Sequence, residues 1–311
     1  MVNGLSWARR MARTVAYARL PTEQANSRSR TLDKLSTAKL LQLMSREDAS
    51  VPRAVAGVIP QMSRAVNLIA TSLRNHGRLF FLGAGTSGRL GVIEAAECPP
   101  TFNTPPSMVQ AVIAGGRPAV FRSQEGAEDD RRRVRRELRH RVRPGDVVVG
   151  IAASGVTPFV EAGLRESRRL GCSAILVTCH PRSRLRGAAD LVIAPRVGPE
   201  LITGSTRLKA GTATKLILNM LTVGAMVRLG KVYGNLMVDV RPTSHKLRAR
   251  ALTIIQAVAG VSARQATRAL AQARGRVKPA IVMAAGGVDF PTASRMLARH
   301  RGMLRRALSR P

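Results

Sequence analysis

The sequence predicts an α/β fold, namely a doubly wound parallel sheet followed by a small, mainly helical C-terminal domain. Three observations support this fold class. Short apolar runs rich in Val, Ile and Leu recur along the first two thirds of the 311 residues, helix-length segments separate them, and loops rich in Gly, Ser and Thr follow them. Strands that are apolar throughout are buried on both faces, as in a parallel sheet covered by helices. Ligands in such folds bind at the carboxyl ends of the strands.

The expected elements follow in chain order. Strands are expected at 78–82 and in the runs MVQAVIAGG, DVVVGIAASG, CSAILVTCH and ADLVIAP. Helices are expected at 54–77, 125–142, 158–170 and 206–230. The last of these is apolar on two faces, which suits a core helix or a subunit interface. After Pro242 the pattern is one of short helices with a single strand-like run, PAIVMAAGG.

Three segments are expected: an N-terminal extension over 1–21, the α/β domain with its N-terminal helices over 22–245, and a small helical domain over 246–311. The extension contains several Arg and is mildly amphipathic. A targeting peptide, a disordered extension and an upstream start codon all fit that pattern. No uninterrupted apolar run is long enough to span a bilayer, so no membrane is expected as a partner.

The formal net charge of +33 comes from 51 basic residues, of which 7 are Lys and 44 Arg. Such a skew is more typical of genome base composition than of selection for nucleic acid. The stretch DDRRRVRRELRHRVRPGD at 129–146 predicts a helix with one solvated face, broken at Pro144; binding of RNA, DNA or an anionic membrane is the alternative. Only nine aromatic residues are present, and they are scattered, so nucleic acid is not expected as a partner. The charge would attract an anionic phosphate substrate.

The three cysteines, Cys98, Cys172 and Cys179, indicate neither a disulfide framework nor a metal site, because no pair has CxxC spacing. Cys98 lies between Glu97 and Pro99 and could be a nucleophile. No His motif accompanies it, so a small buried residue is the favoured interpretation.

Three polar loops follow the expected strands. Their residues are Gly85-Thr86-Ser87-Gly88, Ser154-Gly155-Val156-Thr157-Pro158 and Gly204-Ser205-Thr206. Hydroxyls and backbone N–H groups at helix N-termini bind phosphate oxygens well. None of the loops matches the GxxxxGK[ST] pattern, and no acidic residue supports a dinucleotide site around GAGTSG. Each loop alone could be a helix cap, but three of them at strand ends predict a phosphate ligand.

Carboxylates cluster in one part of this basic chain, since six of the 18 fall between 94 and 130. Glu97 ends the helix after the first strand, and Glu128 comes after the second. Adjacent strands could bring both to one crevice, where one carboxylate would act as base and the other as acid. The alternatives are a salt bridge for Glu97 and a favourable charge at a helix N-terminus for Glu128.

Taken together, the motifs are more specific than any of them alone. In order along the chain they are LGAGTSGRLGVIEAAECPPTF, IAGG, EGAED, VVVGIAASGVTPFV, TGSTRLKAGTATKLILNMLTVG and GKVYGNLMVDV. From about Thr22 to the C-terminus the chain resembles the N-acetylmuramic acid 6-phosphate etherase family. These are bacterial enzymes of the sugar isomerase (SIS) fold, related to glucokinase regulatory proteins, which bind sugar phosphates without catalysis.

The resemblance implies a cytoplasmic enzyme that cleaves the lactyl ether at carbon 3 of N-acetylmuramic acid 6-phosphate. The products are N-acetylglucosamine 6-phosphate and D-lactate, formed by elimination and then hydration in the salvage of cell-wall amino sugars. The resemblance also implies a homodimer and no metal or redox cofactor. A non-catalytic sugar-phosphate regulator is the alternative, but the presence of both glutamates favours the enzyme.

The resemblance also assigns roles to residues. Glu97, in ECPP, matches the acid that protonates departing lactate, and Glu128, in EGAED, matches the second catalytic glutamate, a reasonable base at carbon 2. The phosphate cradle and the rest of the substrate pocket match Thr86, Ser87, Ser154, Gly155, Thr157, Ser205, Thr206 and Lys209. Lys209 could instead stabilise the enolate-like charge that forms after proton removal.

The chain departs from the family pattern at three positions. Val156 stands where the family has Arg, Glu94 stands where it has Asp, and Ser244 lies near a usual Asn. The change at Val156 removes a cation beside the phosphate loop and is expected to weaken substrate binding.

Overall fold

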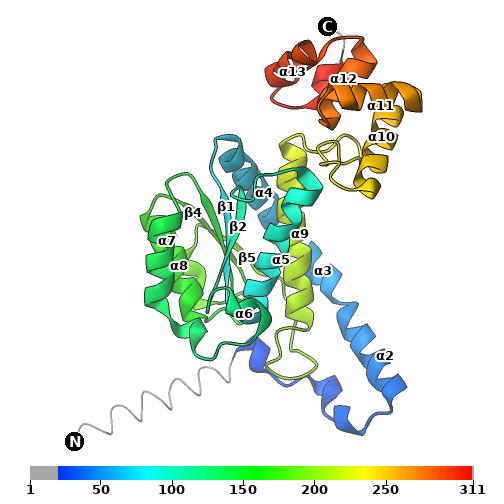
Figure 1. Ribbon diagram of the computed structural model, residues 1–311. Helices are drawn as coiled ribbons and strands as arrows, with labels where there is room; N and C mark the ends of the chain where they lie inside the picture. The colour runs from blue at the N-terminus through cyan, green and yellow to red at the C-terminus, as the bar shows by residue number, and fades with distance from the viewer. Residues whose placement is uncertain (1–19, 310–311) are drawn as a thin grey trace, which may run out of the picture. The chain divides into compact units, whose positions relative to one another are not determined.

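A computed structural model describes residues 20–309, which form two compact units. Within the described residues, the first unit combines 20–94 with Gln110–Leu221, and the second combines Ala95–Val109 with 222–309. The N-terminal extension expected at 1–21 lies outside the described residues except for its last two positions. Figure 1 shows the elements of both units.

The first unit is built on a five-stranded sheet. Its strands are β1 (Leu79–Gly83), β2 (Val109–Ile113), β3 (Val147–Ile151), β4 (Ser173–Val177) and β5 (Leu191–Ile193). They lie in the order β2-β1-β3-β4-β5, and the pairs β1/β3, β3/β4 and β4/β5 are parallel. All five residues of β1 and of β3 are buried. The predicted parallel doubly wound sheet is therefore confirmed.

One face of the sheet is covered by α7 (Arg131–Arg141) and α8 (Pro158–Arg169), which lie side by side in Figure 1. Val134 and Leu138 bury the inner side of α7, while most of its arginines are exposed. This is the solvated charged helix expected from the sequence, although it begins at Arg131 rather than near 125. A short 3-10 turn, η4 (Ala127–Asp129), precedes it, and Asp130 caps its N-terminus.

Three helices lie on the other side of the sheet in Figure 1: α4 (Ile59–Arg74), α5 (Gly85–Phe102) and α9 (Lys209–Arg228). The helix expected over 54–77 is in fact two helices, α3 (Val51–Ala56) and α4, because the chain turns at Gly57 and Val58 and restarts with Pro60 in the first turn. Gly91 of α5 packs so closely on Phe81 that an added Cβ would lie 2.8 Å from the Phe81 Cβ.

The α9 helix corresponds to the long apolar segment of the sequence. Among the described helices, it is the one long and apolar enough to cross a membrane by length and composition. Of the window that meets this criterion, 56% is buried inside the protein, as in a packed core helix. Length and hydropathy alone therefore do not make α9 a membrane span.

The described part of the first unit contains six further elements. They are η1 (Pro21–Glu23), η2 (Ser27–Ser29), η3 (Leu32–Lys34), α2 (Thr37–Asp48), α6 (Pro118–Phe121) and η5 (Arg184–Ala188). Of these, η2 and the end of α2 supply residues to the polar network described below.

The C-terminal part of the second unit is helical. Its helices are α10 (His245–Ala259), α11 (Ala263–Gln272), α12 (Val277–Gly286), α13 (Phe290–Arg299) and α14 (Leu304–Leu308). The interpretation of the run PAIVMAAGG as strand-like is wrong, since the run lies in α12. Every residue from Val277 to Met283 is buried, because α10, α11 and α13 pack around α12. A helix surrounded in this way is apolar on all sides, and its sequence pattern cannot be told from that of a buried strand.

Candidate functional site

The site begins at the point where the strand order of the sheet reverses. After β1 the chain adds β2 on one side, and it then returns to place β3 on the other. In open parallel sheets a crevice forms at such a point, outside the carboxyl ends of the two neighbouring strands. The loops that leave β1 and β3 carry two of the three predicted polar loops, so the fold brings these two loops to one edge.

The loop after β1 is the first turn of α5. The helix begins at Gly85, whose φ of +52° is a conformation that favours glycine, and Thr86 and Ser87 follow at once. Gly88 allows the turn to lie against the sheet, because a Cβ there would be 2.7 Å from the carbonyl oxygen of Gly83. The first turn of a helix leaves backbone N–H groups without intrahelical partners, and they attract anions.

The loop after β3 contains Ser154, Gly155 and Thr157. Side chains from the segment after β4 contact the carbonyl oxygens of this loop. His180 Nδ1 lies 3.3 Å from Ser154 O, and Ser183 Oγ donates a hydrogen bond to Gly155 O at 2.6 Å. Arg184 Nη2 donates a hydrogen bond to Val156 O at 3.2 Å. Thr157 precedes α8 and makes no side-chain capping bond. The carbonyls are thus occupied, while the hydroxyls of Ser154 and Thr157 have no hydrogen bond within the described part of the chain.

Arg184 lies next to Val156, the residue that replaces the arginine expected from the family resemblance. The Arg184 guanidinium is exposed and sits on the backbone of Val156 itself. A cation therefore stands beside the loop after β3, although it comes from η5 rather than from the loop. Sequence analysis missed it, since the two positions are 28 residues apart.

The third polar loop, with Ser205 and Thr206, leads into α9. Its backbone is held by the hydrogen bond from Gly204 N to Thr22 O, at 2.9 Å. The buried carboxylate of Glu200 caps the helix, since it accepts the N–H groups of Lys209 and Ala210, each at 2.9 Å. Burial raises the pKa of Glu200, and these two backbone donors oppose the rise.

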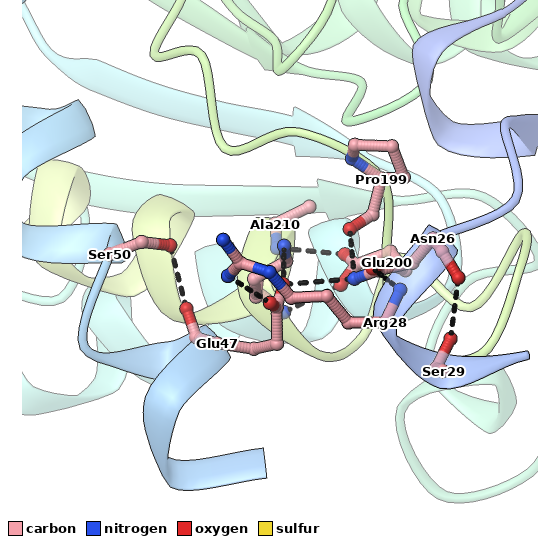
Figure 2. A network of polar contacts seen from close by, with 9 residues as sticks. Asn26, Arg28, Ser29, Glu47, Ser50, Pro199, Glu200 and Ala210 are labelled. Atoms are coloured by element: carbon pink, nitrogen blue, oxygen red, sulfur yellow. Dashed lines mark hydrogen bonds and ion pairs between the residues drawn. The ribbon is translucent and has the colours of Figure 1, made fainter. Parts of the chain in front are cut away.

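Glu47 is the centre of a polar network that includes Asn26 and Arg28 (Figure 2). The buried side chain of Lys209 is part of the same network. One Glu47 oxygen accepts hydrogen bonds from Lys209 Nζ at 2.6 Å and Asn26 Nδ2 at 2.9 Å, and the other accepts one from Arg28 at 2.9 Å. Burial acts to raise the pKa of Glu47, but the bonds from Lys209, Arg28 and Asn26 outweigh it and hold the pKa below its ordinary value. The network joins α2 and η2 to the start of α9.

This arrangement does not support the expectation that Lys209 completes the substrate pocket. Its side chain is only 4% exposed, and its ammonium is taken up by Glu47. Sequence reasoning had no signal for this pairing, because the two residues are 162 positions apart.

Glu128 lies on the wall of a cavity of about 170 Å³ in the first unit. The cavity is lined by Ala84, Gly85, Arg89, Ala114, Ala119, Ser123, Gln124, Glu125, Gly126, Ala127 and Glu128. It therefore joins the start of α5 to the segment after β2. Glu128 is solvent-exposed, yet partial desolvation raises the pKa of its carboxyl, and the charges of Asp129 and Glu125 raise it further. A carboxylate with a raised pKa is better suited to accept a proton near neutral pH.

Glu97 is exposed on α5, close to the helix end as predicted. It belongs to the segment Ala95–Val109 of the second unit, whereas Glu128 belongs to the first. The pairing of these two glutamates around one substrate stays a prediction. Cys98, the alternative nucleophile, is buried.

Glu94 lies three residues before Glu97, and it forms an ion pair with Lys215 of α9 at 2.9 Å. Lys215 also contacts the side-chain oxygen of Asn219. The Glu94 side chain is buried, so the pair links α5 to α9 inside the first unit. Within residues 20–309, no group of three or more His, Cys, Asp or Glu side chains is placed to hold a metal ion.

The strand order and the polar loops at the carboxyl ends of β1 and β3 are those of a doubly wound ligand-binding domain, and a family match identifies its class as a sugar isomerase (SIS) domain. Residues 61–167 match the family model of the glucokinase regulatory protein N-terminal SIS domain. The fold is similar to that of a phosphoheptose isomerase from Francisella tularensis, with a TM-score of 0.51 and 15% identity over 62% of this chain and 100% of that chain.

Sequence relatives are far more similar. An N-acetylmuramic acid 6-phosphate etherase from Symbiobacterium thermophilum is 54% identical over 264 residues, which are 85% of this chain and 88% of that protein. One from Rhodopirellula baltica is 51% identical over 85% of this chain and 87% of its own length. The chain therefore belongs to the N-acetylmuramic acid 6-phosphate etherase family.

Proposed function

We propose that this chain hydrolyses the D-lactyl ether of N-acetylmuramic acid 6-phosphate and releases N-acetylglucosamine 6-phosphate and D-lactate. The observation that carries the proposal is the 54% identity to the Symbiobacterium thermophilum etherase over nearly the whole of that protein. The reaction would serve the recycling of cell-wall amino sugars. The raised pKa of Glu128 at a cavity wall supports the assignment of a base to this site.

The proposed route is elimination followed by hydration. In the open-chain sugar, the aldehyde at carbon 1 acidifies the proton on carbon 2, which Glu128 removes. The bond from carbon 3 to the ether oxygen then breaks, and Glu97 donates the proton that leaves with D-lactate. Water adds its hydroxyl to carbon 3 of the unsaturated aldehyde, and a proton returns to carbon 2. Two carboxylates can divide these tasks if their pKa values differ.

The phosphate of the substrate would lie at the carboxyl ends of β1 and β3. Thr86 and Ser87 on one side, and Ser154, Gly155 and Thr157 on the other, would supply hydroxyl and N–H donors. Arg184 would provide the positive charge that Val156 cannot. Ser205 and Thr206 would complete the pocket, while Lys209 is better explained as a structural partner of Glu47.

We further propose a homodimer that works in the cytoplasm, with 22–245 and 246–311 as its two domains. Support for the dimer comes from α9, where Met220, Val223 and Val227 are each more than 40% exposed. Their spacing places them on one helix face, and an exposed apolar stripe of this kind is typical of subunit contacts. The net charge of +33 would attract a substrate that carries a phosphate and a carboxylate, rather than a nucleic acid.

The test is to incubate the purified protein with N-acetylmuramic acid 6-phosphate in deuterated water and to follow D-lactate and deuterium at carbon 2. The wild-type protein should release D-lactate. Glu97→Gln should stop that release yet still exchange the carbon 2 proton, because only the acid is missing. A wild-type protein that binds the sugar phosphate without releasing lactate would instead be a regulator, as the glucokinase regulatory protein match allows.

A further inference from the structure

Arg89 lines the same cavity as Glu128 and carries a positive charge. It lies on α5, directly after the Gly85–Gly88 turn, and among the described residues that line this cavity no other carries a positive charge. Glu125 and Glu128 line the same cavity with two negative charges. An anionic group of a ligand that enters here would be repelled by both glutamates, unless a cation offsets them.

The Arg89 guanidinium is oriented by one hydrogen bond. Its Nε donates to the carbonyl oxygen of Val120, in α6, at 3.0 Å. A guanidinium carries five N–H donors in one plane, so this bond leaves the four donors of the two terminal nitrogens. Within residues 20–309, Arg89 forms no ion pair with a carboxylate at salt-bridge distance. The terminal nitrogens therefore form a planar fork that is free to bind an oxyanion.

The chemistry of the proposed substrate identifies the anion. The molecule carries a phosphate at carbon 6 and a carboxylate on the lactyl group at carbon 3. Glu128, the proposed base at carbon 2, lies on the wall of this cavity, and carbon 3 is bonded directly to carbon 2. The lactyl group must therefore come close to the residues around Glu128. A planar carboxylate matches the guanidinium fork in a two-point hydrogen bond.

We propose that Arg89 binds the carboxylate of the lactyl group, and so selects the ether-bearing amino sugar 6-phosphate over the same sugar without the ether. This inference rests on the proposed function and adds a substrate-binding residue to it. The phosphate loops alone would hold substrate and sugar product equally well, since both carry the phosphate. Arg89 distinguishes them by the one charged group that the reaction removes.

The experiment compares two ligands on the variant Arg89→Gln. The KM for N-acetylmuramic acid 6-phosphate is measured by lactate release, and the Kd for N-acetylglucosamine 6-phosphate, which lacks the lactyl group, by calorimetry. We expect the KM to rise about 10- to 100-fold, as for loss of a charged two-point hydrogen bond. The Kd for the product should change by less than about 2-fold, the precision of the comparison. Arg89→Lys, which keeps the charge but not the fork, should fall between wild type and Arg89→Gln.

Matched controls make the outcomes distinct. Arg122→Gln removes an equal charge from an exposed arginine next to α6 that does not line the cavity, and it should leave both constants near wild type. Equal weakening of both ligands by Arg89→Gln would overturn the inference in favour of a phosphate contact. Unchanged constants would overturn it in favour of a purely structural bond to Val120. Absence of lactate from the wild-type protein would count against the proposed function, and product binding could still be measured.

Discussion

Two clusters in the first unit use the same kinds of side chain in different ways. Around Glu47, both carboxylate oxygens have donors, and Glu47 and Lys209 are buried. At the cavity, Glu128 is exposed, and its pKa is raised by partial desolvation and by neighbouring carboxylates. Thr86 and Ser87, at the start of α5, make no side-chain hydrogen bond within residues 20–309. Satisfied polar groups stabilise a fold, whereas unsatisfied donors and a carboxylate with a shifted pKa are available to a substrate.

The largest effect is expected from Glu128→Gln. Glutamine has nearly the same shape but cannot accept the proton, so lactate release and carbon 2 exchange should both fall by about 10²- to 10⁴-fold. The temperature of thermal unfolding should not fall, because Glu128 is exposed and makes no ion pair within the described residues, and its charge is repelled by Asp129 and Glu125. Turnover and exchange are measured on the same protein sample by lactate assay and proton NMR.

Glu125→Gln is the matched control for this variant. Glu125 is also exposed and lines the same cavity, but it is assigned no role in proton transfer. We expect its turnover to stay within a few-fold of wild type. The reverse result, in which Glu125→Gln is inactive and Glu128→Gln is active, would identify Glu125 as the base and contradict the assignment.

The second prediction concerns the satisfied cluster. Lys209→Met removes the buried ammonium from Glu47 but leaves the bonds from Arg28 and Asn26, and it should lower the free energy of unfolding by roughly 1–3 kcal/mol. The double variant with Glu47→Leu should regain most of this loss, because it removes the buried charge as well. Urea unfolding of both single variants and the double variant measures the coupling. If Lys209→Met kept full stability but lost turnover, Lys209 would be assigned to substrate binding after all.

The difference between the clusters also explains what the sequence could reveal. The strands and the loops after β1 and β3 depend on residues close together in the chain, so apolar runs and Gly-Ser-Thr turns predict them. The partners of Glu47 come from separate segments, and no local pattern marks them. Arg89 is within a motif, but its exposure to the cavity depends on how the segment after β2 folds over α5. The prediction of a strand at PAIVMAAGG was wrong for a related reason, since the neighbouring helices determine the burial of α12.

The smallest effect, and the one that separates the clusters most directly, is their response to acid. The base must be unprotonated, so kcat/KM should fall as the pH drops through the pKa of Glu128, which is raised above its ordinary value. Glu47 has a lowered pKa in the folded protein, so its stabilising contribution is present above the pKa of the unfolded chain. That contribution is lost only as the pH falls through the lower folded value. Activity should therefore disappear before stability does when the pH is lowered.

Asp129→Asn tests the cause of the shift at Glu128. The Asp129 charge is one of the groups that raise the pKa of Glu128, so its removal should move the acid limb of the kcat/KM profile to lower pH. The urea unfolding profile against pH should not move, because Asp129 is exposed and lies outside the Glu47 network. An acid limb that stays in place would assign the shift to desolvation and to the charge of Glu125 instead. A limb that moves to higher pH would show that the titrating group is not Glu128, since removal of a negative charge cannot raise the pKa of a neighbouring carboxyl through Coulomb interaction.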